Sequence, residues 1–154
     1  MTRDLLIRDA VPDDAVTLAW IHTHSRAAAM PWLAVMHSER EVEQWMADVV
    51  LARHRVRVAV RQGVVVGFTA FTDGWLEQLY IHPDFRRQGV GSSLFADACD
   101  SAGGAAFQLW VFQRNMRARR FYERHGCRLI KLTDGQGNEE REPDALYEKP
   151  AVRE

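Results

Sequence analysis

Cysteine is scarce in this chain, which limits the covalent cross-links that could support its fold. Cys99 and Cys127 are the only two cysteines, they lie far apart, and neither belongs to a Cys-x-x-Cys pair. A disulfide between the two cysteines is one alternative. Two buried thiols in a reducing cytoplasm are the favoured interpretation.

Long apolar runs are also missing. No stretch approaches the roughly 18 consecutive apolar residues that a membrane-spanning helix requires. Residues 1–9 carry charges and contain no apolar run, so no secretory signal is visible. These absences predict a cytoplasmic protein with no membrane partner.

Metal-binding motifs are absent from the sequence as well. It has six histidines but no His-Glu-x-x-His motif and no Cys/His cluster. His22 and His24 stand two positions apart in an expected helix, so their side chains diverge. We therefore expect no metal ion.

No excess of charge of one sign exists either, since 20 Lys and Arg against 21 Asp and Glu leave a net charge of -1. Nothing in this balance favours binding to nucleic acid. Arginines nevertheless crowd residues 114–128. Such a cluster is usually a solvated helix face, but it could also complement a small polyanion.

What is present is the composition of one ordinary globular domain. The chain has 154 residues, 47% of them hydrophobic and 27% charged, which is enough for one sizeable core. Neither an internal repeat nor a linker is visible, so we expect a single domain over residues 1–154.

The hydrophobic periodicity and the turn signals predict an α+β domain. Helices are expected at 12–28, 38–53, 89–102 and 115–125. Strands are expected at 5–7, 56–60, 64–66, 75–81, 107–111, 129–133 and 145–148. Three of the strands follow one another at hairpin spacing, which indicates an antiparallel meander.

The most informative segment runs from Leu79 to Ser92. It contains a strand, a loop with Gly89 and Gly91, and then an apolar helix. Glycines allow tight turns that expose backbone amides, and a helix N-terminus adds partial positive charge, so this arrangement binds phosphate. A Walker loop is excluded because no Gly-Lys-Ser/Thr follows. The dinucleotide fingerprint fails because its third glycine would fall at Leu94.

Two motifs each follow an expected strand. Residues 86–91 read Arg-Arg-Gln-Gly-Val-Gly, and residues 115–126 read Asn-Met-Arg-Ala-Arg-Arg-Phe-Tyr-Glu-Arg-His-Gly. They resemble the acetyl-CoA signature Gln/Arg-x-x-Gly-x-Gly/Ala and the Asn-x-x-Ala-x-x-Phe-Tyr-x-x-x-Gly motif of the GNAT superfamily of N-acetyltransferases. The motifs occur in family order, each after a strand, and the element order is similar from Leu5 to Lys149. The resemblance implies a central mixed, mostly antiparallel twisted sheet of about seven strands, flanked by about four helices.

The resemblance also implies acetyl-CoA as co-substrate and a role for each matching position. The backbone of Leu79, Tyr80 and Ile81 would pair with the pantetheine arm, although core packing alone also explains these residues. Asn115 would contact the pantetheine region. The pyrophosphate loop would consist of Arg86, Arg87, Gln88, Gly89, Val90, Gly91 and Ser92.

Tyr122 matches the family's general acid. A phenol, with a pKa near 10, can protonate a departing thiolate whose conjugate acid has a pKa of about 8.5. The alternative is that Tyr122 only packs beside Phe121. Some family members carry a glutamate base on the strand before the second motif, but Trp110 in this region cannot accept a proton. Glu77, expected on the same strand face as Leu79 and Ile81, is the remaining candidate base, acting through water, unless it is simply a charged residue near a strand end.

The acceptor site is expected where the first two helices meet the last hairpin. The segments involved are residues 30–33, Trp45 with Met46, and residues 139–144, where aromatic and sulfur side chains could form an apolar wall and carboxylates could attract an amine. The acceptor stays open between a small-molecule amine and a peptide or protein amine.

The predicted reaction is direct attack of a primary amine on acetyl-CoA within a ternary complex, because neither cysteine has a nucleophile-like setting. The alternative is a non-catalytic acyl-CoA-binding sensor. A homodimer is compatible with the sequence and is left open.

Overall fold

The computed structural model describes residues 4–152, which form seven strands and several helical segments. The strands are β1 (Leu5–Asp9), β2 (Arg55–Arg61), β3 (Val64–Thr72), β4 (Trp75–Ile81), β5 (Phe107–Phe112), β6 (Arg128–Leu132) and β7 (Asp144–Lys149). The helices are α1 (Ala15–Ala29), α2 (Glu39–Trp45), α3 (Leu51–Arg53), α4 (Val90–Ser101) and α5 (Met116–Arg124). Short turns precede α1 at Pro12–Asp14 and α4 at Pro83–Phe85.

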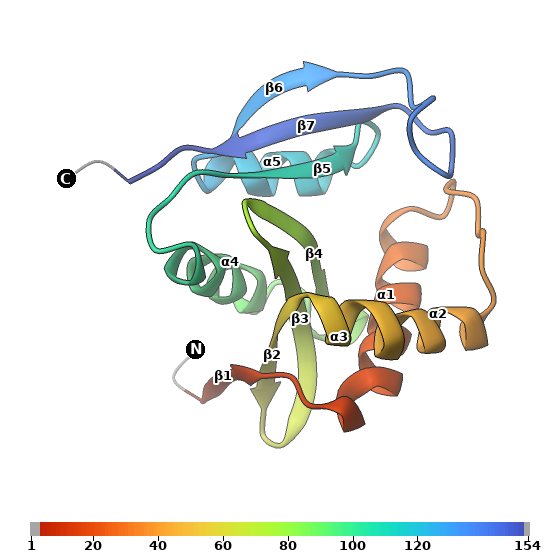
Figure 1. Ribbon diagram of the computed structural model, residues 1–154, viewed down its shortest axis with the longest axis vertical. Coiled ribbons are helices and arrows are strands. Elements are labelled where there is room, and N and C mark those ends of the chain that lie inside the picture. Colours follow the sequence, from red (N-terminus) through yellow and green to blue (C-terminus); the bar gives the residue numbers. More distant parts are fainter. Residues whose placement is uncertain (1–3, 153–154) are drawn as a thin grey trace.

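All seven strands belong to one sheet with the order β1-β2-β3-β4-β5-β7-β6. Every neighbouring pair is antiparallel except β4 with β5. The sheet therefore has two antiparallel halves joined by one parallel contact, and Figure 1 shows β4 and β5 running apart from that junction. The expected mixed, mostly antiparallel sheet is confirmed.

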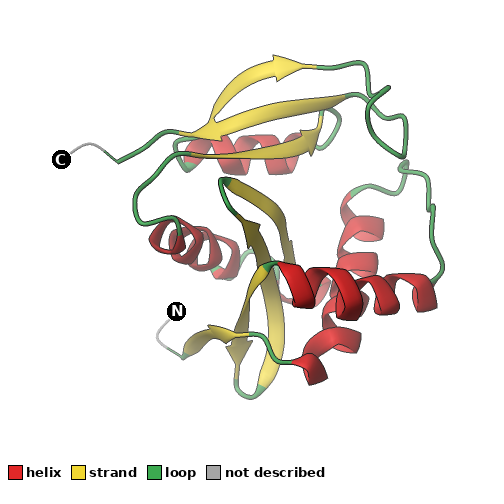
Figure 2. Ribbon diagram, in the orientation of Figure 1, coloured by secondary structure: helices red, strands yellow, loops and turns green. Residues whose placement is uncertain are grey.

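Helices cover both faces of the first half of the sheet (Figures 1 and 2). On one face, Leu18 and Ile21 of α1 and Met46 pack on Val58 and Phe68 in a fully buried core. On the other face, Val90 and Leu94 of α4 pack on Ala59 and Val66. The helix α5 instead packs on the second half of the sheet, in a cluster with β5 and β7. Counting the continuous segment from α2 to α3 as one helix, the expected four helices are present.

Local sequence signals explain where most of these elements begin. The Ser38 hydroxyl accepts from the Glu41 amide and the Glu41 carboxylate accepts from the Ser38 amide, which forms the expected capping box at α2. The helix then continues through a π-type segment, Met46–Val50, to Arg53. Near residue 12 the expected helix begins one turn late, because Pro12–Asp14 forms a 3-10 turn before α1.

Both cysteines are free thiols, Cys127 buried and Cys99 partly buried, which resolves the open disulfide alternative in favour of thiols. Within residues 4–152, no helix is long and apolar enough to cross a membrane. The same residues contain no group of three or more His, Cys, Asp or Glu side chains arranged to hold a metal ion.

Candidate active site

The separation of β4 from β5 creates the opening in which the site lies. The two strands share one residue pair, Trp75 with Gln108, whereas β3 and β4 pair along most of their length. From Glu77 onward, β4 therefore pairs with β3 on one side and with no described strand on the other. An extended ligand could add to this open edge by main-chain hydrogen bonds.

A bulge interrupts β4 just where the strands separate. Ala70 faces Gln78 and Phe71 faces Leu76, so Glu77 is the extra residue between two registered pairs. Leu76 consequently packs in the same cluster as Leu79. The bulge interrupts the simple alternation from which the face of Glu77 was predicted, and the exposed Glu77 side chain lines the opening together with Leu79.

The loop before α4 presents backbone amides at a helix N-terminus. Gly89 is the N-cap of α4 and has a φ of 82°, and Arg87 also has a positive φ of 63°. A left-handed residue followed by a helical one turns successive N–H groups toward the same point, which favours an anion. Residues 86–89 are exposed, so a phosphate can reach these amides.

Several side chains of this loop are already engaged within the protein. Gln88 accepts a hydrogen bond from Arg61 over 2.7 Å, and Val90 is buried in the core. His125 contacts both the Phe121 carbonyl (2.7 Å) and the Ser92 hydroxyl (3.0 Å). The capacity of residues 88–92 to hold an anion therefore resides in their backbone N–H groups.

A cavity of about 600 Å³ lies in the opening between β4 and β5. The structure brings several of the predicted residues together around it: Glu77, Leu79, Tyr80, Asn115 and Tyr122 all line the cavity. Ile81 packs instead against α4, and the residues of the pyrophosphate loop do not line this cavity. The cavity and the loop thus form two separate parts of the predicted site, connected along the open edge of β4.

Tyr122 lies in the wall of the cavity with 9% of its surface exposed. Its ring packs against Phe121 and Phe95, with centroids 5.3 and 6.1 Å away, and this packing leaves the residue in contact with the cavity. Burial raises the pKa of its phenol above the ordinary value. The hydroxyl is therefore held in its protonated form, as a proton donor requires.

The other two predicted side chains have defined local partners. Glu77 accepts a hydrogen bond of 3.0 Å from the Thr72 hydroxyl, which orients its carboxylate at the cavity rim. Asn115 caps α5 by accepting from the Ala118 amide over 3.3 Å. The cap occupies the amide oxygen of Asn115, so the NH₂ group remains as a donor toward the cavity.

Comparisons with known proteins identify the family. Residues 18–127 match the model of the acetyltransferase (GNAT) family. The chain belongs to the GNAT family. An uncharacterized N-acetyltransferase of Archaeoglobus fulgidus is 33% identical over 98 residues, which are 54% of this chain and 66% of that protein, just under two thirds. The uncharacterized N-acetyltransferase YafP of Escherichia coli is 30% identical over 117 residues, 76% of this chain and 70% of YafP.

Solved structures share the GNAT fold at low sequence identity. Apo YjaB from Escherichia coli has a TM-score of 0.78 and 23% identity, with 96% of this chain and 99% of YjaB covered. YncA from Salmonella typhimurium, solved with its cofactor acetyl-CoA, has a TM-score of 0.71 and 19% identity over 97% of this chain and 95% of YncA. These structural similarities support the assignment of the GNAT fold to this chain.

A second cavity, of about 400 Å³, lies where α1, α2 and the loop between β6 and β7 meet. Met30, Leu33, Trp45, Glu139 and Glu140 line it, so the expected segments do meet in space. Two parts of that expectation are wrong. Met46 is fully buried in the core, and Glu142 pairs with Arg114 instead.

Among the residues that line the first cavity without having been assigned to the site by the sequence analysis, three are notable. Trp110 is 45% exposed there. Gln78 is buried, and its side-chain oxygen has no hydrogen-bond partner among the described residues. Arg26 lines both cavities and donates to the Tyr80 hydroxyl (3.0 Å) and to Glu140 (2.9 Å). No local motif marks Arg26, because Glu140 is 114 positions away in the chain.

Proposed function

We propose that this protein transfers the acetyl group of acetyl-CoA to a primary amine by direct attack in a ternary complex. The observation that carries the proposal is the unpaired edge of β4, which connects the amide-rich loop at Gly89 with the cavity that Tyr122 lines. These features fit acetyl-CoA, since a diphosphate suits the helix N-terminus and an extended pantetheine arm suits an open strand edge.

In the proposed reaction, acetyl-CoA supplies the thioester and the amine nitrogen forms a bond to its carbonyl carbon. As the carbon–sulfur bond breaks, the Tyr122 hydroxyl gives its proton to the departing thiolate. Glu77 takes the excess proton of the amine through a water molecule. The oxygen of Gln78, which lacks an internal partner, is an acceptor available to position the amine N–H groups.

A covalent acetyl-cysteine intermediate does not fit the two thiols. Burial raises the pKa of Cys127 to about 12 and also raises that of Cys99, so both are poor nucleophiles at neutral pH. Neither residue lines the two cavities described above. Because free thiols are typical of reducing compartments, the proposal places the enzyme in the cytoplasm.

Saturating acetyl-CoA should stabilise the protein, because it binds the folded chain and not the unfolded one. At 100 times the dissociation constant the gain is about 2.7 kcal/mol, which corresponds to a rise in Tm of about 5–10 °C. Differential scanning fluorimetry measures this shift, with calorimetric titration as the binding assay and adenosine as the control ligand. No shift and no heat at saturating acetyl-CoA would refute the cofactor assignment.

Glu77→Gln should lower turnover chiefly at pH values where the acceptor amine is protonated, below about 10 for an alkyl amine. A base matters only while a proton must be removed, so rates of the variant and the wild type should converge as the pH approaches that value. A pH–rate profile of kcat/KM for the amine tests this, with Thr72→Val as a control that removes the hydroxyl orienting the carboxylate. Equal profiles for wild type and Glu77→Gln would remove Glu77 from the mechanism and leave solvent as the base.

A further inference from the structure

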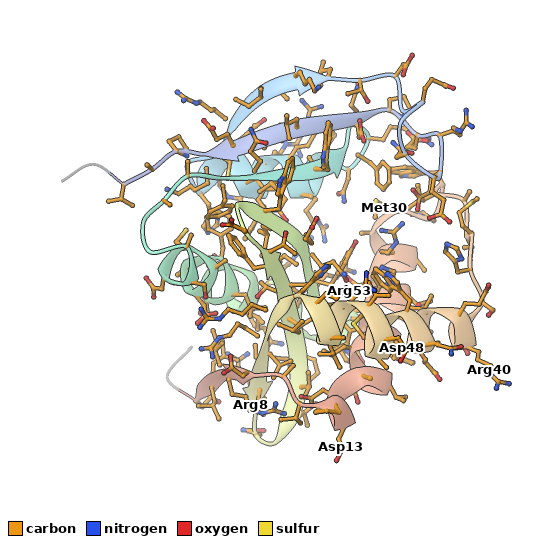
Figure 3. All side chains as sticks on the ribbon, in the orientation of Figure 1. Arg8, Asp13, Met30, Arg40, Asp48 and Arg53 are labelled. Atoms are coloured by element: carbon orange, nitrogen blue, oxygen red, sulfur yellow. The ribbon has the colours of Figure 1, made fainter. Side chains whose placement is uncertain are left out.

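The second cavity is separated from the first by a shared wall that carries charge. Arg26 and Met30 line both cavities. In Figure 3, Met30 lies at the end of α1 close to the loop between β6 and β7. An acceptor whose amine reaches the reaction cavity while its remaining atoms occupy the second cavity must pass alongside these two side chains. The second cavity therefore contacts the part of the acceptor that does not react, and this contact can select among acceptors.

The floor of the second cavity is apolar. Met30, Leu33 and Val42 are buried there, and the Trp45 ring, 37% exposed, lies edge-on to His22 with centroids 5.3 Å apart. Burial lowers the pKa of His22 to about 3, so its imidazole adds no positive charge at neutral pH. An apolar or aromatic body is the complementary occupant of such a surface.

The rim of the second cavity is negative. Three carboxylates, those of Glu41, Glu139 and Glu140, line it together with one guanidinium, that of Arg26. Arg26 is already paired with Glu140, and their side chains are only 22% and 14% exposed. Glu139 has His37 as its partner. A carboxylate on the ligand would meet an excess of like charge and an arginine that is already neutralised, whereas an ammonium group is attracted.

We propose that the acceptor is a primary amine with an apolar, preferably aromatic, body and no carboxylate, and that the Arg26–Glu140 pair is what rejects carboxylated amines. This inference rests on the proposed acetyltransfer. It selects among the acceptors that the proposed function leaves open. In this proposal Glu140 determines which acceptors bind, and other residues carry out the chemical step.

The test compares three amines at saturating acetyl-CoA: 2-phenylethylamine, phenylalanine, which adds a carboxylate, and ethylamine, which lacks the ring. Release of the CoA thiol measures kcat/KM. We expect 2-phenylethylamine to exceed each of the others by about tenfold or more, because like-charge contacts and lost apolar burial each cost at least that factor.

Two variants and one control show which side chains produce these acceptor preferences. Glu140→Gln keeps the shape but leaves the charge of Arg26 without its carboxylate partner, so the preference against phenylalanine should shrink by about tenfold. Trp45→Ala should instead reduce the advantage of 2-phenylethylamine over ethylamine. Asp48→Asn is the control, because Asp48 is exposed on the same helical segment (Figure 3) and lines neither cavity, so both preferences should stay unchanged.

Calorimetric binding of the same amines to the CoA-loaded protein separates the two proposals. If 2-phenylethylamine binds more tightly than phenylalanine and ethylamine but no amine is acetylated, the acceptor preference stands and the proposed reaction fails. If amines are acetylated but phenylalanine or ethylamine equals 2-phenylethylamine, the preference is wrong and the reaction stands. An unchanged preference in folded Glu140→Gln would overturn the role of the ion pair.

Discussion

Tyr122→Phe should lower kcat by about 100-fold while the affinity for acetyl-CoA changes little. The substitution deletes the hydroxyl that would protonate the departing thiolate, an interaction made chiefly in the transition state, so kcat falls and KM for acetyl-CoA is nearly constant. The ring and its contacts with Phe95 and Phe121 remain. No hydrogen bond is lost among the described residues, so Tm should also be nearly unchanged.

The pH dependence of the wild type gives a second measurement of the same role. A general acid acts while it is protonated, and burial raises the pKa of Tyr122 above the ordinary value of about 10. Activity should therefore not decline through deprotonation of this group until the pH exceeds about 10. A decline near pH 8 that disappears in Tyr122→Phe would contradict the high pKa.

Tyr147→Phe is the matched control, because it removes a hydroxyl from the same apolar cluster. The Tyr147 hydroxyl donates to Glu123 (2.6 Å) and accepts from Arg119 (3.0 Å), and Tyr147 does not line either cavity described above. This variant should lose stability, by about 1–3 kcal/mol, with kcat nearly unchanged. Full activity of Tyr122→Phe would remove the acid role. Tight acetyl-CoA binding by a wild type that acetylates no amine would favour the sensor alternative.

Elements that depend on local chemistry could be predicted from the sequence. The capping box at Ser38, the glycine turn at Gly89 and the alternation of valines in β2 each follow from a few adjacent residues. The loop at residues 86–91 and the Asn115–Gly126 motif together indicated the GNAT family. These signals are local because caps and turns satisfy backbone groups within about one helical turn.

Features that depend on contacts between distant segments could not be predicted in this way. The bulge at Glu77 exists only because β3 and β4 change register there, so alternation along β4 alone could not reveal it. The Arg26–Glu140 pair joins α1 to the loop before β7. Met46 was expected near the acceptor because of its neighbour Trp45, but adjacent positions on a helix face different directions, and Met46 is in the core.

Gly89→Asp should weaken acetyl-CoA binding by about 100-fold or more, because a carboxylate would lie among the amides proposed to hold the pyrophosphate. Like charges in close contact cost several kcal/mol. The effect on the apo protein should be smaller, since aspartate tolerates a positive φ better than most residues and is a favourable N-cap. Calorimetric titration with CoA gives the affinity, and the melting temperature of the apo protein reports the cost to the fold.

Gly89→Asn separates charge from shape. Asparagine has nearly the same size as aspartate and also tolerates the left-handed conformation that Gly89 adopts, with φ of 82°, so both variants impose the same backbone strain and the same side-chain bulk. If electrostatic repulsion of the diphosphate dominates, the asparagine variant should bind CoA at least about tenfold more tightly than the aspartate variant. Pantetheine, which has no diphosphate, should bind both variants and the wild type alike. Normal CoA affinity in a folded Gly89→Asp protein would show that the diphosphate lies elsewhere, and an equal, large loss in both variants would assign the effect to bulk at the N-terminus of α4.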